Sequence, residues 1–155
     1  TADAEAASHV SNRVWELSEF LTSVLGVKLT DGGAPVSVVL HTSCSARRET
    51  DALQTTRALL GQLDQVTLKI QDHESECCGF GGLFSVRHPE ISGGIVRDKV
   101  AAISQSGADV LITGDCGCML NITGHAKKVG ADIQGMHLAS FLLARNLGLT
   151  NEDKS

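Results

Sequence analysis

The strongest constraint on the fold is a series of short apolar runs separated by stretches long enough to hold a helix. Residues 36–40 and 110–112 are nearly continuous aliphatic runs, mostly β-branched, as is typical of strands buried on both faces of a parallel sheet. Residues 66–70 alternate apolar with polar side chains, and residues 133–136 form a weaker fourth run. Because the intervals are too long for hairpins, we expect a parallel sheet with right-handed crossover helices on both faces.

The intervals between these runs carry helical periodicity and helix stop signals. Together with the strands they predict an α/β, Rossmann-like three-layer domain with a mostly parallel, four-stranded sheet at residues 31–148, followed by a disordered tail at 149–155. The expected helices lie at residues 4–25, 51–60, 89–107, 115–130 and 137–146.

Composition narrows the class of protein. The 155 residues are 42% hydrophobic, enough for one globular domain with its own core. A net charge of −5 without a basic run argues against nucleic acid as a partner, and no apolar stretch approaches the roughly 20 residues that cross a membrane. The first residues lack a signal-peptide layout, so we expect a cytoplasmic protein without membrane insertion. In that reducing compartment, five cysteines indicate metal ligands or redox thiols rather than disulfides.

The five cysteines follow three of the four predicted strands. Cys44 comes after the first strand, Cys77 and Cys78 after the second, and Cys116 and Cys118 after the third. The carboxyl ends of parallel strands meet at one edge of a sheet, where ligand sites form. The sequence therefore predicts that these sulfur atoms gather at the C-terminal edge of the strands.

The adjacent pair Cys77-Cys78 and the glycine-rich turn at 79–82 favour a polynuclear metal centre. Soft thiolates select zinc, copper(I) or iron–sulfur clusters. Neighbouring side chains diverge, so the pair reaches two metals of one cluster more easily than it chelates a single ion. Helix N-termini just after Cys78 and Cys118 are expected to add partial positive charge there. The residues expected to turn backbone N–H groups toward the sulfurs are Gly79, Gly81 and Gly82.

Other uses of the cysteines stay open at this point. They could hold structural zinc in an interaction module. Cys44 alone could be a buried free thiol. Cys116 and Cys118 could form a thiol–disulfide pair, although they are one residue apart rather than the two of a thioredoxin-like motif.

Three other kinds of side chain could act together with these cysteines. Asp115 fits a helix cap better than a ligand. His41 and His137 are either outer-shell donors or satisfied residues at strand ends. The arginines that could clamp a small acid, but fit a solvated surface better, are Arg47, Arg48, Arg57, Arg87 and Arg97.

The segment at residues 77–86 resembles the cysteine-rich CCG domain family, and within it the lactate utilization protein A group. Residues 41–44 are similar to the family's first cysteine motif, residues 108–122 to its last, and residues 136–139 to its closing segment. Relatives in the wider family include the glycolate oxidase iron–sulfur subunit and the corresponding subunit of heterodisulfide reductase. The resemblance covers the chain from about Trp15 to about Leu143.

The resemblance implies a set of ligands. Cys44, Cys77, Cys78 and Cys118 are the matched positions, which suits a [4Fe–4S] cluster, with zinc possible in aerobically purified protein. Many members carry Cys-x-x-Cys in the last motif, whereas here an aspartate stands at the first cysteine position. The extra thiol of Cys116, one residue later, is an alternative ligand.

The resemblance also implies a role. It is that of an iron–sulfur subunit that relays electrons in a complex oxidising L-lactate to pyruvate, with other subunits of that complex as partners. Members with two tandem domains imply that residues 1–30 are a helix and linker following a preceding CCG domain of the same chain. A zinc-stabilised interaction module and a cluster-based disulfide reductase component are the alternatives.

Overall fold

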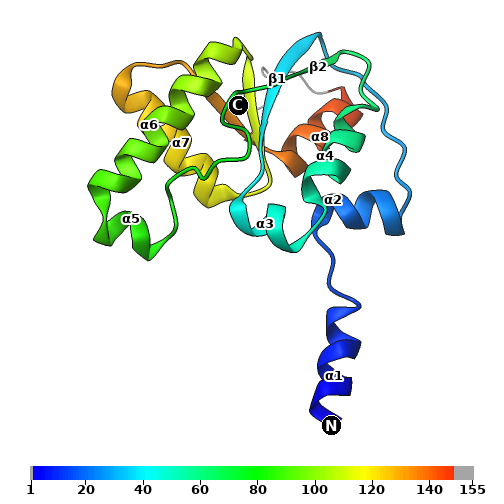
Figure 1. The fold of residues 1–155 in the computed structure, drawn as a ribbon. Coiled ribbons are helices and arrows are strands. Elements are labelled where there is room, and N and C mark those ends of the chain that lie inside the picture. Colours follow the sequence, from blue (N-terminus) through cyan, green and yellow to red (C-terminus); the bar gives the residue numbers. More distant parts are fainter. Residues whose placement is uncertain (1, 149–155) are drawn as a thin grey trace.

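The computed structural model describes residues 2–148, so the tail predicted at 149–155 lies outside the described residues. Its centre is a four-stranded sheet in the order β2-β1-β3-β4, in which every neighbouring pair is parallel (Figure 1). The predicted α/β fold with a parallel four-stranded sheet is confirmed. The strands are β1 (Val36–His41), β2 (Val66–Lys69), β3 (Val110–Thr113) and β4 (Gln134–His137).

Helices cover both faces of the sheet. In Figure 1, α6 and α7 lie on one side, and α4 and α8 on the other. Alternation along β1 explains the two layers, because Val38 packs with the side chains of α4 and α8 while Val39 packs with those of α6 and α7. No helix among residues 2–148 has the length and apolar content needed to cross a membrane. The helices are α3 (Cys44–Glu49), α4 (Ala52–Leu60), α5 (Leu83–Arg87), α6 (Pro89–Ser106), α7 (Cys116–Val129) and α8 (Leu138–Leu147).

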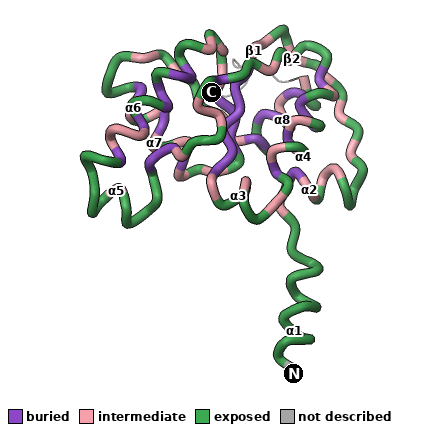
Figure 2. The backbone as a smooth tube through the Cα atoms, in the orientation of Figure 1, coloured by how far each residue is buried: buried purple, intermediate pink, exposed green. Residues whose placement is uncertain are grey.

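The N-terminal region differs from the prediction of one helix over residues 4–25. It contains α1 (Ala2–Ser11), then α2 (Leu17–Glu19), which continues as the π-helix η1 (Phe20–Val24). The interruption has a local cause. Glu16 adopts extended backbone angles and its carboxylate accepts from the backbone of Ser18 and Glu19, which starts a new helix with a capping box. As a result α1 projects away from the body of the molecule and is exposed along its length (Figures 1 and 2).

Two short helices were not predicted. The helices α3 and α5 have six and five residues, too few to show an apolar period in sequence. The strand expected to reach Ile70 ends at Lys69, and the Ile70 side chain is 76% exposed. The C-terminal caps predicted at glycines are present, with Gly107, Gly130 and Gly148 in left-handed conformation.

A buried ion pair ties the loop before β1 to the last helix. The Arg145 guanidinium on α8 pairs with the Asp31 carboxylate and donates to the carbonyl oxygens of Ala34 (2.6 Å) and Gly33 (3.2 Å). The same carboxylate accepts from the backbone N–H of Gln65 at 2.7 Å, just before β2. One charged pair therefore joins α8 to the segments that lead into both β1 and β2.

Replacing Arg145 with methionine should lower the free energy of unfolding by about 3–5 kcal/mol, because it leaves Asp31 buried without its partner. Denaturant unfolding of the metal-free protein measures the difference. The matched control is Arg97→Met, whose exposed pair with Asp98 should contribute under about 0.5 kcal/mol. Equal effects of the two substitutions would contradict the assigned role of the buried pair.

Candidate metal centre

Two cysteines that are distant in sequence, Cys78 in an irregular segment and Cys118 in the first turn of α7, meet under the C-terminal edge of the sheet. The Sγ atoms of Cys78 and Cys118 lie 3.0 Å apart, and both side chains are buried in the apolar cluster between the sheet and helices α6 and α7. His41, the last residue of β1, completes a group whose ligand atoms all lie within 4.8 Å of one another. Forty residues of sequence separate the two thiols, so the parallel topology brings them together.

A second thiol pair adjoins the first. Cys44, at the start of α3, and Cys77 are half-buried, and their thiols interact with each other. Since Cys77 precedes Cys78, the two pairs share one segment of backbone. Cys116 is different, because its side chain is exposed and lies outside the group formed by His41, Cys78 and Cys118.

Side chains of α6 and α7 hold residues 73–79, the cysteine segment, in place. Ser92 on α6 donates its hydroxyl to the Gly79 carbonyl at 2.7 Å, and Asn121 on α7 donates to the Cys78 carbonyl at 2.8 Å. The Gly79 N–H points back to the Cys77 sulfur at 3.2 Å, as expected for a glycine that turns its amide toward the site. Gly79 has a φ of +85°, and a Cβ there would lie 2.6 Å from the Ser92 carbonyl oxygen. Only glycine fits this position without moving α6.

The buried thiol pair is polarised. The hydrogen bond between the two thiols, helped by His41 and by the Phe80 N–H, lowers the pKa of Cys78 to about 4 despite the opposing effect of burial. The same bond, together with burial, raises the pKa of Cys118. Burial is also the main cause of a raised pKa at Cys77. The lowered pKa favours the thiolate of Cys78, which is the form in which a cysteine can bind a metal.

His41 is closer to the thiols than the sequence indicated. Its side chain is 0% exposed, and neither ring nitrogen has a hydrogen-bond partner, which is costly unless a ligand occupies one of them. His137, by contrast, caps α8 through Nδ1 and bonds the Gly114 carbonyl through Nε2 at 3.0 Å. Of the two histidines, His137 is therefore the strand-end residue whose ring nitrogens both have hydrogen-bond partners. The signal that could have distinguished His41 is its spacing of two from Val39, which places both on the α6/α7 face of β1.

The helix that carries Cys118 begins where the predicted range of 115–130 put it, which corrects the separate expectation of a helix N-terminus just after Cys118. Helix α7 starts at Cys116, so Cys118 lies inside the first turn rather than before the helix. Asp115 caps α7 as expected, accepting from the Cys118 N–H at 2.9 Å. After Cys78, the next helix begins only at Leu83, so the expected helix N-terminus directly behind this cysteine is absent from the described residues.

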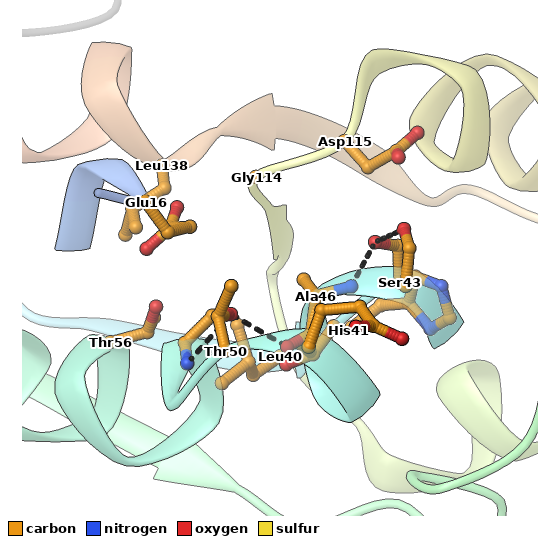
Figure 3. A pocket seen from close by; sticks show the side chains of 14 residues that line it. Glu16, Leu40, His41, Ser43, Ala46, Thr50, Thr56, Gly114, Asp115 and Leu138 are labelled. Atoms are coloured by element: carbon orange, nitrogen blue, oxygen red, sulfur yellow. Dashed lines mark hydrogen bonds between the residues drawn. The ribbon is translucent and has the colours of Figure 1, made fainter. Parts of the chain in front are cut away.

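A cavity of about 340 Å³ lies beyond the ends of β1 and β3, and its described lining includes His41 but none of the cysteines. This is the point where the strand order reverses direction, between β1 and β3. Figure 3 shows Glu16 and Leu138 on one side of it and Ser43 and Asp115 on the other. Its described lining includes the carboxylates of Glu16, Glu49 and Asp115 and no lysine or arginine, so the cavity is unsuited to an anion such as a hydroxy acid.

The donor set fits a thiophilic metal centre. The group combines a buried thiolate, a second buried thiol and an imidazole with both nitrogens unpartnered, and the Cys44–Cys77 pair adjoins it. Zinc and iron–sulfur clusters both take such ligands. The arrangement can hold a metal centre that bridges two thiol pairs, or one ion at the group of three.

The cysteine-rich domain family CCG matches residues 38–123, which include most of β1, all five cysteines and most of α7. The chain therefore belongs to the CCG cysteine-rich domain family. Its similarity to curated proteins extends further. It is 40% identical over 138 residues to lactate utilization protein A of Halalkalibacterium halodurans. It is 37% identical over 145 residues to the proteins of that name from Bacillus cereus strain G9842 and Bacillus cytotoxicus.

These alignments are unequal in coverage. They include 92% of this CCG chain but 60% of the two Bacillus proteins, and 89% of this chain but 57% of the Halalkalibacterium protein. The chain thus spans somewhat over half the length of the relatives it matches.

The packing of Gly79 against α6 can be tested directly by substitution. Gly79→Ala should destabilise the metal-free protein by about 2–4 kcal/mol, because the methyl group both strains a positive φ and collides with α6. Gly124→Ala, in α7 with open space around its Cα, should be neutral or stabilising by up to about 1 kcal/mol. Thermal and denaturant unfolding measure both, and a tolerated alanine at position 79 would show that the segment is not gripped by α6.

Proposed function

We propose that this CCG chain is the iron–sulfur electron-transfer part of a system that oxidises L-lactate to pyruvate. The observation that carries the proposal is the 3.0 Å contact between the Cys78 and Cys118 sulfurs, next to Cys77, whose pKa the neighbouring Cys44 thiol helps to raise. Thiols from the segments that follow three strands match the requirement of a polynuclear centre for several thiolates at different metals. When bound, such a cluster supplies one-electron transfer.

The protein's own residues would support that cluster in distinct ways. Cys44, Cys77, Cys78 and Cys118 would hold it, which suits a [4Fe–4S] type, while the Gly79 and Phe80 amides already point at the sulfurs of Cys77 and Cys78. Gly81 and Gly82, both with positive φ, would shape the turn that follows. Burial among α6 and α7 would exclude water from the Cys78 side of the site.

The lactate substrate and the partners rest on similarity. Proteins named lactate utilization protein A align with most of this chain, and they supply the substrate and the expectation of further subunits. The acidic cavity supports an electron relay rather than a lactate-binding site, because it offers no cation for a carboxylate. We place the protein in the cytoplasm and expect a preceding CCG domain in the natural chain, which the intact mass of the natural product tests.

Anaerobic reconstitution with iron and sulfide should give a brown protein with acid-labile sulfide. Cys78→Ser and Cys118→Ser should lose most of the iron, because each removes a buried sulfur from the group of three. Cys116→Ser is the matched control, since this side chain is exposed, and its electron paramagnetic resonance signal should equal that of the wild type. An altered signal in the control would make Cys116 a ligand.

The same reconstitution experiment distinguishes the iron–sulfur function from the second candidate function, which is that of a zinc-stabilised interaction module. The close group of His41, Cys78 and Cys118 favours this candidate, because three donors within 4.8 Å suit a single ion. A colourless anaerobic protein with one zinc per chain, lost on His41→Ala, would favour zinc and overturn the electron-transfer proposal.

A further inference from the structure

Lys99 on α6 is a buried cation close to the cysteine segment. Its side chain is 1% exposed, the lowest exposure of any lysine or arginine among the described residues. Its ammonium group donates to the backbone carbonyl of His73, in the loop that leads from β2 to Cys77. Lysine is almost never fully buried unless a negative group balances its charge.

No such group is bound to Lys99 within the described part of the chain. The ion pairs of this part join other residues: Glu74 pairs with Arg57, and Glu76 pairs with His73. Burial lowers the pKa of Lys99, and the neighbouring positive charge of Arg47 lowers it further. The groups that act in the opposite direction are Glu76, which is largely exposed, and the thiols of Cys78 and Cys77. The protein alone leaves this cation under-compensated, and the cysteine site is the buried place where an anion would balance it.

Lys99 belongs to the face of α6 that supports the site. Ser92, Val96 and Lys99 are spaced four and three residues apart, all are buried, and they follow one side of the helix. Ser92 holds the carbonyl of Gly79, just after the cysteines, and Lys99 holds that of His73, just before them. Helix α6 therefore binds the cysteine segment at both ends. The donor is the neutral Ser92 hydroxyl at Gly79 and the charged Lys99 ammonium group at His73.

A simple hydrogen-bond clamp does not need a charge. Ser92 performs the same kind of task without one, and a buried ammonium is destabilising where a neutral donor would serve. What a positive charge adds is attraction to a negatively charged centre, which acts strongly through a dry interior.

We propose that Lys99 is a positioning and charge-compensating residue for an anionic, thiolate-held metal centre, and that it raises the reduction potential of that centre. Reduction adds an electron to a site that is already negative, so a fixed cation nearby favours the reduced form. The inference rests on the proposed iron–sulfur function. It adds that the centre carries net negative charge and that α6, which contributes no ligand, sets its potential.

The test compares Lys99→Met, Lys99→Gln and Lys99→Arg with the wild type after anaerobic reconstitution with iron and sulfide. Potentiometric titration should show lower midpoint potentials for the methionine and glutamine variants, by about tenfold in the one-electron equilibrium, or about 59 mV. Lys99→Arg keeps the charge and should stay near the wild type. The control is Lys128→Met, an exposed lysine at the end of α7, which should leave the potential unchanged.

Denaturant unfolding with and without the cluster distinguishes charge compensation by Lys99 from the effect of its hydrogen bond to His73. Without metal, Lys99→Met should unfold at the same or higher denaturant concentration than the wild type, because it removes an unbalanced buried charge. With the cluster bound, it should unfold at lower concentration than the wild type. A variant that loses stability equally in both states is explained by the lost bond to His73 and overturns the inference.

The outcomes also distinguish the inference from the function it rests on. Wild-type protein that takes up no iron and sulfide overturns the proposed function, and the inference falls with it. Wild-type protein that binds a cluster, beside a Lys99→Met variant with equal cluster content and equal potential, overturns the inference alone.

Discussion

The structure depends on the contact between helix α6 and the irregular segment that follows β2. Strands and helices place Cys44 and Cys118 by themselves, because each lies in the first turn of a helix that directly follows a strand. Cys77 and Cys78 have no such support, since residues 77–80 belong to no helix or strand. Their position is fixed by Ser92, Lys99 and Asn121, which bind backbone carbonyls of residues 73–79. Without these hydrogen bonds, Cys77 and Cys78 would lie in a mobile loop, and their thiols would not face those of α3 and α7.

The same arrangement couples the site to the core. Cys78 and Cys118 pack in one apolar cluster with Val39, Leu111 and Ile122, so these candidate metal donors are part of the layer between the sheet and α7. A metal bound there would add its binding free energy to folding, and its removal would leave a polarised thiol pair and an unpartnered His41 inside that layer. The opposite layer, under α4 and α8, is aliphatic and aromatic and is closed by the buried Arg145–Asp31 pair. Both faces of the sheet therefore contribute to the core, and the candidate metal donors lie on the α6/α7 face alone.

Much of the fold was predictable because it rests on periodic patterns. The aliphatic run of residues 36–40 and the run at 110–112 identified the central strands, and glycines marked three helix ends. The parallel direction predicted for the strands placed Cys118 and Cys78 at the same edge of the sheet, but their 3.0 Å approach depends on the irregular segment after β2, because β1 lies between β2 and β3. The break at Glu16 was missed because the apolar period of residues 10–25 continues across it, while a local capping box decides the backbone. Lys99 was missed for a related reason, since a lysine on a helix is normally solvated, and its burial depends on a loop that crosses α6 without any sequence signature.

The central claim is that thiols from the segments that follow three strands hold one metal centre at this edge of the sheet. The most direct measurement is anomalous diffraction at the iron edge from crystals of the anaerobically reconstituted protein. The account predicts one group of anomalous peaks from iron, in contact with the sulfur atoms of Cys44, Cys77, Cys78 and Cys118. Iron bound elsewhere, or a peak that Cys44 or Cys118 does not reach in well-ordered backbone, would contradict it.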